Sequence, residues 1–226
     1  MTSIARARVA MLVVVACLTW AGAAGAEVIG KATGPLEATK AREAECSFGD
    51  LVADAARSAV GAEVALVQAS QLRDGTLPAG DLRREDLAGL LLYPDEKVVL
   101  VELGGAQLQA ALERGLSMVG KRNTAFLQVS GMTVTFRSDA PKDHRVLGVQ
   151  VGGAPLASGR TYKVAMPSSL ANGALGYFRV FNPIKVTKVG PAIGDAVADY
   201  VAAARTVSPQ SGRLRDLAPR GGPVTA

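Results

Sequence analysis

Three stretches of the chain return to an apolar side chain every three or four positions. They are residues 47–60, 106–119 and 193–204. This spacing places the apolar side chains on one helical face, so it predicts three amphipathic helices. Ser47, followed three residues later by Asp50, resembles a capping box, which predicts that the first helix begins at this point.

Short apolar runs bounded by polar residues, glycine or proline predict β-strands. These runs are residues 63–68, 96–103, 126–136, 145–151 and 161–166. We find no long internal linker, heptad repeat or low-complexity block between them. Strands and helices in this mixed order predict a single α/β domain of mixed α+β type, with sheets and helices in layers.

Composition agrees with one globular domain. The 226 residues are 49% hydrophobic and 4% aromatic, which is typical of a chain with a single compact core. We expect residues 42–206 to form this domain, preceded by a linker at residues 27–41. Residues 207–226 are basic and are expected to form a flexible tail.

The first 26 residues have the features of a secretory signal peptide. Arg6 and Arg8 precede an apolar run that is shorter than a transmembrane helix requires. Small residues precede the expected cleavage site after Ala26. Cleavage after Ala26 would make the protein periplasmic or secreted. The alternative is a lipoprotein box that ends at Cys17, which would anchor the chain to a membrane. The residues after Cys17 are apolar, where a lipoprotein would have a polar tether, and this favours the signal peptide.

The charge distribution gives little support to nucleic-acid binding. Removing Arg6 and Arg8 lowers the formal net charge from +5 to +3. The segment from Arg205 onward holds four arginines against Asp216 alone, so the body of the chain is balanced. Nucleic-acid binding uses a broad basic face or aromatic residues interleaved with basic ones, and neither is present.

Several catalytic classes lack the residues that they need. His144 is the one histidine of the chain and stands in a polar turn, so neither a dinuclear metal site nor a serine triad has its usual partners. Cys46 lies beside a helix start, where a packed thiol is the default. No phosphate-binding glycine loop of the usual spacing occurs. We therefore expect no cofactor, no metal site and no catalytic residue.

Five segments, in order, nevertheless carry a resemblance. They are ECSFGDLVADAAR, VALVQASQLRDGTLPAGDLRREDL, KVVLVELGGAQLQAALERGLS, FLQVSGMTVTF and GGAPLASGRTYKVAMPSSLANGALGY. Together they resemble the C-terminal domain of the 5′-nucleotidase family, from about Arg42 to about Arg213. In full-length members this domain follows a metallophosphatase domain and holds the nucleoside part of the substrate. The resemblance implies the fold of that domain and, because the catalytic domain is not part of the match, a chain that is inactive alone.

The resemblance also implies a substrate-binding set. Arg73 ends the segment that matches the family's arginine loop, and Arg42 lies near a second arginine of the family. Tyr93 is one residue ahead of the first stacking aromatic of the family. Asn172 and Gly173 stand in its glycine-rich turn.

Other positions depart from the family pattern. Pro94 and Ser169 replace the two stacking aromatics, and Leu175 replaces a carboxylate. Base stacking contributes about 1–3 kcal/mol per base in nucleic-acid systems, so nucleoside binding should be weakened. Arg73 retains the chemistry to pair with a phosphate or carboxylate, or to bond loop carbonyls instead.

Three functions remain open from the sequence. The first is an exported, non-catalytic binding or accessory module related to nucleotide hydrolysis, with a small anion or a nucleotide as ligand. The second is a subunit of a nucleotide hydrolase that a separate metallophosphatase chain completes. The third is a scaffold with a degenerate pocket.

Overall fold

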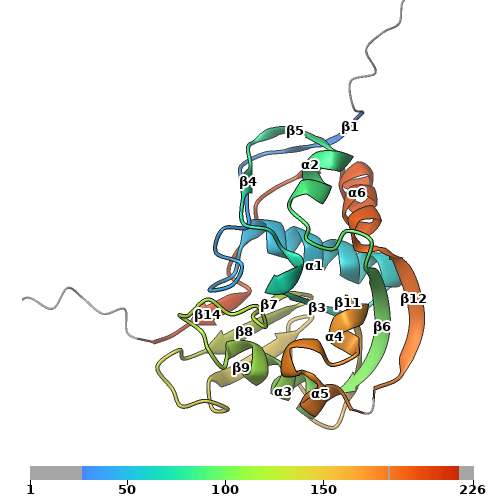
Figure 1. Cartoon of the computed structure of the whole chain (residues 1–226). Coiled ribbons are helices and arrows are strands. Elements are labelled where there is room, and N and C mark those ends of the chain that lie inside the picture. The colour runs from blue at the N-terminus through green and yellow to red at the C-terminus, as the bar shows by residue number, and fades with distance from the viewer. Residues whose placement is uncertain (1–26, 183, 219–226) are drawn as a thin grey trace, which may run out of the picture.

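The computed structural model describes residues 27–182 and 184–218. The signal peptide, the cleavage site after Ala26 and the alternative lipidation site at Cys17 lie outside these residues. A five-stranded mixed sheet crosses the centre of the molecule (Figure 1). Its strands, in spatial order, are β12 (Val186–Ala192), β6 (Lys97–Gly104), β11 (Thr161–Pro167), β3 (Val64–Gln68) and β7 (Leu127–Ser130).

The composition of the inner strands reflects burial on both faces. All five residues of β3, VALVQ, are buried. β3 pairs in parallel with β11, where Val164 lies opposite Val64, and β11 pairs antiparallel with β6 over seven residues. A strand covered on both faces reads as a continuous apolar run rather than an alternating one, and this explains why the sequence pattern identified these strands.

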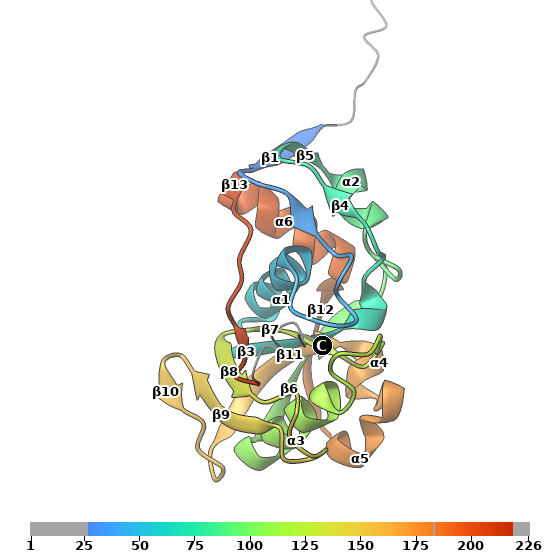
Figure 2. The same cartoon turned by 90° about the vertical axis from the view of Figure 1, so that its left-hand side faces the viewer.

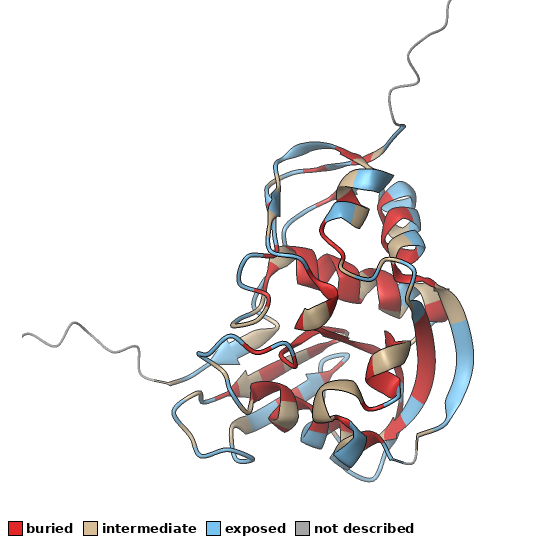
Figure 3. Ribbon diagram, viewed as in Figure 1, coloured by how far each residue is buried: buried red, intermediate tan, exposed pale blue. Residues whose placement is uncertain are grey.

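Helices cover both faces of this sheet (Figure 2). α1 (Ser47–Val60) and α6 (Ile193–Ala204) lie on one side, where α1 packs against the strands and α6 packs against α1. On the other side lie α3 (Gly105–Leu116), α4 (Ser168–Ala171) and α5 (Phe178–Phe181). The buried residues are concentrated in α1 and the central strands (Figure 3).

Three smaller sheets flank the central one. The four-stranded sheet has the order β10-β9-β8-β14, the three-stranded sheet β13-β1-β5, and the two-stranded sheet β2-β4. A short helix, α2 (Arg84–Gly89), follows β5. The strands of these sheets are β1 (Val28–Ala32), β2 (Leu36–Glu37), β4 (Thr76–Leu77), β5 (Gly80–Arg83), β8 (Met132–Phe136), β9 (Val146–Val151), β10 (Ala154–Pro155), β13 (Thr206–Val207) and β14 (Leu214–Asp216).

The segment at residues 27–41, expected to be a linker, belongs to the folded body. β1 pairs antiparallel with β5 and in parallel with β13, so that Lys31 lies opposite both Asp81 and Thr206. Leu36 and Ala38 are buried. The sequence pattern missed this because β1 is short and its partners are distant in the chain.

The start of the expected flexible tail is also part of the fold. β14 pairs in parallel with β8, with Leu214 opposite Val134. The guanidinium of Arg213 reaches α1, where Nη1 and Nη2 donate to the two carboxylate oxygens of Asp54 at 2.9 and 2.8 Å. The expectation of a flexible tail is therefore wrong for residues 207–218, while residues 219–226 lie outside the description.

The first helix begins at Ser47, as predicted, but without the predicted capping box. The N-cap residue is Cys46, and no side chain caps it. The Ser47 hydroxyl instead accepts a hydrogen bond from the Glu37 amide at 2.8 Å. The Asp50 side chain is fully buried and points toward Arg213, since its Oδ1 lies 3.7 Å from Arg213 Nε.

Candidate functional site

The loop that carries Arg73 is held by backbone hydrogen bonds. After β3 the chain makes a short 3₁₀ turn, and the Arg73 amide donates to the Leu90 carbonyl at 2.9 Å. The Leu92 amide donates to the Gln71 carbonyl at 2.8 Å. The Arg73 side chain is exposed and has no hydrogen-bond or ion-pair partner within the described residues. It does not bond the loop carbonyls, and it is available to a ligand.

Arg42 lies against the same loop. Its Nη1 donates to Asp74 Oδ1 at 2.6 Å, and its Nη2 donates to the Leu72 carbonyl at 3.3 Å. Arg122 Nη2 donates to the other oxygen of Asp74 at 2.7 Å. Hydrogen bonding from Arg122 and the charge of Arg42 lower the pKa of the Asp74 carboxyl. The structure thus brings Arg42 to the Arg73 loop, but the guanidinium of Arg42 is already paired.

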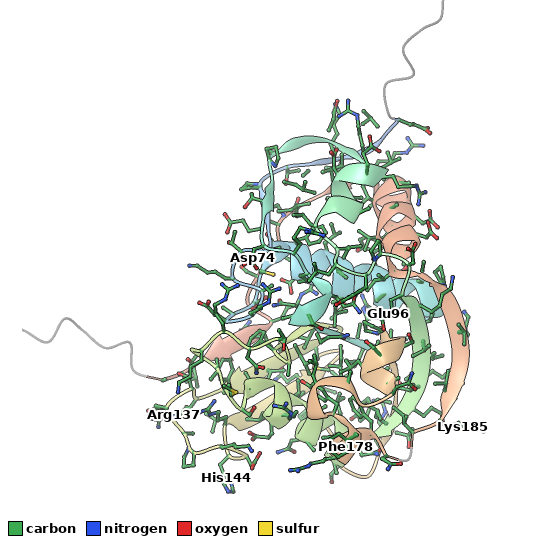
Figure 4. All side chains as sticks on the ribbon, in the orientation of Figure 1. Asp74, Glu96, Arg137, His144, Phe178 and Lys185 are labelled. Atoms are coloured by element: carbon green, nitrogen blue, oxygen red, sulfur yellow. The ribbon has the colours of Figure 1, made fainter. Side chains whose placement is uncertain are left out.

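A polar network surrounds Glu96, which lies near the start of β6 beside α4 (Figure 4). Glu96 Oε1 accepts hydrogen bonds from the Ser169 amide at 2.5 Å and the Ser168 hydroxyl at 3.2 Å, and Oε2 accepts from Gln71. Gln68 Nε2 donates to the Ser169 hydroxyl at 3.0 Å. The side-chain oxygens of Gln68 and Gln71 are buried with no partner among the described residues. This network ties the end of β3, the loop before β6 and α4 together.

Tyr93, Pro94 and Leu175 lie at or beside positions where the family has a stacking ring or a carboxylate, and here they have other surroundings. Tyr93 is exposed, with 59% of its surface accessible. Pro94 lies against the start of α6, where its carbonyl accepts from the Gly194 amide at 2.8 Å. Leu175 has a positive φ of 56° and its carbonyl accepts from Arg114. None of these three provides a buried aromatic ring or a carboxylate.

Asn172 and Gly173 form the turn after α4. Asn172 is exposed, and its amide donates to the Ser168 carbonyl at 3.0 Å. Gly173 has φ of 83°, and a Cβ at this position would lie 2.6 Å from the Phe178 Cα. A glycine is therefore required here by packing, whatever its part in binding. Among the contacts of the described residues, none joins this turn directly to Arg73.

Cys46 and His144 are the other side chains that the sequence analysis considered for catalysis. Cys46 is buried, and burial raises the pKa of its thiol to about 12, so it is protonated at neutral pH. His144 is exposed in a turn. Within residues 27–182 and 184–218, no group of three or more His, Cys, Asp or Glu side chains could hold a metal ion. In the same residues no helix is long and apolar enough to cross a membrane.

Comparison with known proteins agrees with this fold. A sequence model of the 5′-nucleotidase C-terminal domain matches residues 28–183. The chain belongs to this family. It is 30% identical over 211 residues to the 5′-nucleotidase-related protein of Glossina morsitans morsitans, covering 83% of this chain and 38% of that protein. It is 32% identical over 145 residues to the trifunctional nucleotide phosphoesterase protein YfkN of Bacillus subtilis, covering 60% of this chain and 10% of that protein.

Solved structures show the same relationship. The 5′-nucleotidase precursor of Thermus thermophilus superimposes with a TM-score of 0.75 at 28% identity, covering 84% of this chain and 39% of the precursor. The sulfate thiohydrolase SoxB of the same genus, at 22% identity and a TM-score of 0.67, shares the fold. The family and the mixed α/β fold expected from the sequence are therefore confirmed. The chain spans between a tenth and two fifths of the length of these relatives.

Glu96, at the centre of the polar network, was not among the site residues expected from the sequence. Glu96 lies two residues after Pro94, which the family resemblance had already singled out, so its position was visible from the sequence. Its partners were not, because Gln71 and Ser169 are 25 and 73 residues away in the chain. Arg122 was missed for the same reason, since it reaches Asp74 from a loop 48 residues further on.

Proposed function

We propose that this domain is a non-catalytic binding or accessory module related to nucleotide hydrolysis, and that Arg73 anchors a small anion. One observation carries the proposal. The guanidinium of Arg73 is exposed and without a partner in the described residues, whereas the neighbouring Arg42 is paired with Asp74. An arginine side chain that makes no internal contact can form bidentate hydrogen bonds with phosphate or carboxylate.

The surroundings of Arg73 favour an anion over a nucleoside. Ser169, at a stacking position, accepts from Gln68 and donates its amide to Glu96. Pro94, at the other, lies against Gly194. Without two stacking rings a purine loses about 1–3 kcal/mol per contact, which corresponds to one or more powers of ten in affinity.

We propose that any hydrolytic activity requires residues other than those described. A separate metallophosphatase chain is one source, and in that case this domain would be a subunit that contributes substrate binding. Two relatives are named as 5′-nucleotidases or related proteins, and the chain matches 38% and 39% of their lengths, which favours a division of labour between this domain and a catalytic part.

We further propose that the protein is exported to the periplasm or the medium. The support is the leader at residues 1–26 and the start of β1 at Val28, so that cleavage after Ala26 would leave the first strand intact. Mass spectrometry of the native protein should give Glu27 as its first residue. A diacylated Cys17 would show a membrane-anchored lipoprotein instead.

Calorimetry tests the anion site. Inorganic phosphate, AMP and adenosine are titrated into the native chain and into Arg73→Ala. Arg137→Ala is the control, because Arg137 is also exposed but follows β8, where it pairs with Asp139. Phosphate and AMP should bind the native chain and Arg137→Ala, and Arg73→Ala should lose at least about tenfold in affinity. Micromolar adenosine binding that persists in Arg73→Ala would refute the proposal.

A further inference from the structure

A cavity of about 790 Å³ lies between α3, α5 and the loop before β9. Its lining includes Arg114, Lys142, Asp143, Gly176, Phe178 and Arg179. Figure 4 shows Phe178 at the lower edge of the molecule and Asp74, beside Arg73, well above it. The cavity is thus separate from the Arg73 loop. Its volume is within the range of about 300–1,000 Å³ that small-molecule sites occupy.

The charges that face this cavity are mainly positive. Lys142 and Arg179 are exposed, and neither has a carboxylate partner within the described residues. Glu113 is buried, and its carboxylate accepts hydrogen bonds from the amides of Arg145 at 3.0 Å and Val146 at 2.8 Å. The Glu113 carboxylate is therefore occupied by the backbone, and Asp143 is the one carboxylate of the lining that a ligand would meet. The excess of positive charge in the lining favours a negatively charged ligand.

An aromatic ring stands beside these cations. Phe178 exposes 55% of its surface, and the guanidinium of Arg179 lies 5.7 Å from the centre of the Phe178 ring. The backbone beneath the ring is fixed, since the Phe178 amide donates to the Gly173 carbonyl at 3.0 Å. An exposed aromatic ring next to unpaired cations can stack on a flat group while the cations hold its charge.

The wall of the cavity includes backbone in an unfavourable conformation. Among the described residues three non-glycine residues have a positive φ, and two of them, Asp143 and Leu175, are in or next to this lining. Arg114 donates to the Leu175 carbonyl, and its guanidinium fills the space where a Cβ on Gly176 would lie. Conformations of this kind cost about 1–3 kcal/mol each and are concentrated at functional sites.

We propose that this cavity binds an organic anion that contains a planar aromatic ring. The ring lies against Phe178, and its negative group pairs with Lys142 and Arg179. Nucleotides and simple aromatic carboxylates or sulfonates share this chemistry. The site uses none of the residues of the Arg73 loop, so the two proposals succeed or fail separately.

The test uses two probes, naphthalene-1-sulfonate and AMP, titrated by calorimetry into the Arg73→Ala chain, in which the other proposed anion site has been removed. Two variants change the cavity, Phe178→Ala and the double variant Lys142→Ala/Arg179→Ala. Their matched controls are Val189→Ala and Lys188→Ala on β12, which remove an exposed apolar and an exposed cationic side chain elsewhere. Thermal melting checks that every variant is folded.

At least one probe should bind with one-to-one stoichiometry and an affinity better than millimolar. Each cavity variant should weaken this binding about tenfold or more, and each control should leave it within about twofold. Binding of AMP alone would identify a nucleotide as the source of the anion, and binding of the sulfonate would identify simple aromatic anions. The proposal is overturned if neither probe binds, or if the cavity variants bind as tightly as the controls.

Discussion

Asp50 is a carboxyl group whose surroundings oppose its ionisation. It is fully buried in α1, and neither of its oxygens accepts a hydrogen bond from the described residues. Burial raises the pKa of Asp50 to about 9. The charge of Arg213 lowers it and the nearby carboxylate of Glu45 raises it further. A carboxyl with a pKa this high is protonated at neutral pH, so it is neutral in the folded protein.

Stability should therefore depend on pH through Asp50. The pKa is raised in the folded chain, so unfolding releases a proton between about pH 4 and about pH 9, and stability falls as the pH rises through this window. Asp50→Asn removes the effect. The free energy of unfolding of the native chain, measured with urea, should fall relative to Asp50→Asn from about pH 5 to about pH 8.

The control for this measurement is Asp81→Asn, which removes an exposed carboxylate. It should follow the native pH dependence. If the native chain and Asp50→Asn keep a constant difference in stability across this range, Asp50 is ionised in the folded protein and the argument from burial is wrong.

Gly173 shows a second residue whose surroundings limit substitution. Gly173→Ala adds a Cβ 2.6 Å from Phe178 on a backbone with φ of 83°. Gly153→Ala is the matched control, because Gly153 has φ of 85° but nothing within 4 Å of a Cβ. The control should lose about 1 kcal/mol, and Gly173→Ala should lose about 1–3 kcal/mol more. If both variants lose the same free energy of unfolding in urea, the turn after α4 can shift to accommodate a Cβ.

At the scale of elements, Arg213 fixes the C-terminal strand β14 to the core. Besides Asp54, its Nη1 donates to the Val129 carbonyl of β7 at 2.8 Å. Burial lowers the pKa of Arg213, but its hydrogen bonds to the Asp54 carboxylate and the negative charges of Asp54 and Glu45 hold the pKa above its ordinary value. One side chain thus connects β14, α1 and the central sheet.

Arg213→Ala should destabilise the chain by about 3–5 kcal/mol, since it removes the ion-pair partner of the partly buried Asp54 carboxylate and leaves it with the hydroxyl of Ser130. The control Arg215→Ala changes an exposed arginine within β14. Among the described residues its Nε donates only to the nearby Gly212 carbonyl, and the substitution should cost less than about 0.5 kcal/mol. Equal unfolding midpoints in urea would mean that β14 contributes little to the fold.

The elements that sequence reasoning predicted share one physical property. α1, α3, α6 and the strands β3, β6 and β11 each bury a continuous or periodic apolar surface, and that pattern is present in the sequence itself. β1, β5 and β14 are short and partly exposed, and their stability comes from partners far along the chain. β12 exposes Val186 and Val189 at the edge of the sheet. Its apolar residues are therefore not spaced in a pattern that would predict a buried strand.

The candidate site also has a part that the sequence predicted and a part that it did not. The family resemblance implied Arg73 and Arg42 as binding residues, because each lies at or near the position of a binding arginine in the motifs of the family. The pairing of Arg42 with Asp74, and the joining of Gln68, Glu96 and Ser169, depend on how distant segments meet. Sequence spacing carries no information about such contacts, and they are what distinguishes an available arginine from a paired one.

In the molecule as a whole, the family fold with its well-packed core stands beside a loop face on which polar residues bond one another. The central sheet is buried by helices on both faces. Beside it, Glu96 holds α4 by accepting from Ser168 and Ser169. Among the described residues, Arg73, Lys142 and Arg179 are exposed cations without an acidic partner, and the two binding proposals rest on these three side chains.

The chain by itself should not hydrolyse nucleotides with the help of metal ions. Dinuclear metal hydrolases use several histidine and carboxylate ligands, and this chain has one histidine, His144, which is exposed in a turn. The purified protein should therefore release no phosphate from AMP above the blank when manganese is added, in an assay of inorganic phosphate across neutral pH. His144→Ala serves as the control and should be indistinguishable from the native chain. Robust manganese-dependent release that is lost in His144→Ala would show that this histidine belongs to a metal site, and the chain would then be an enzyme in its own right.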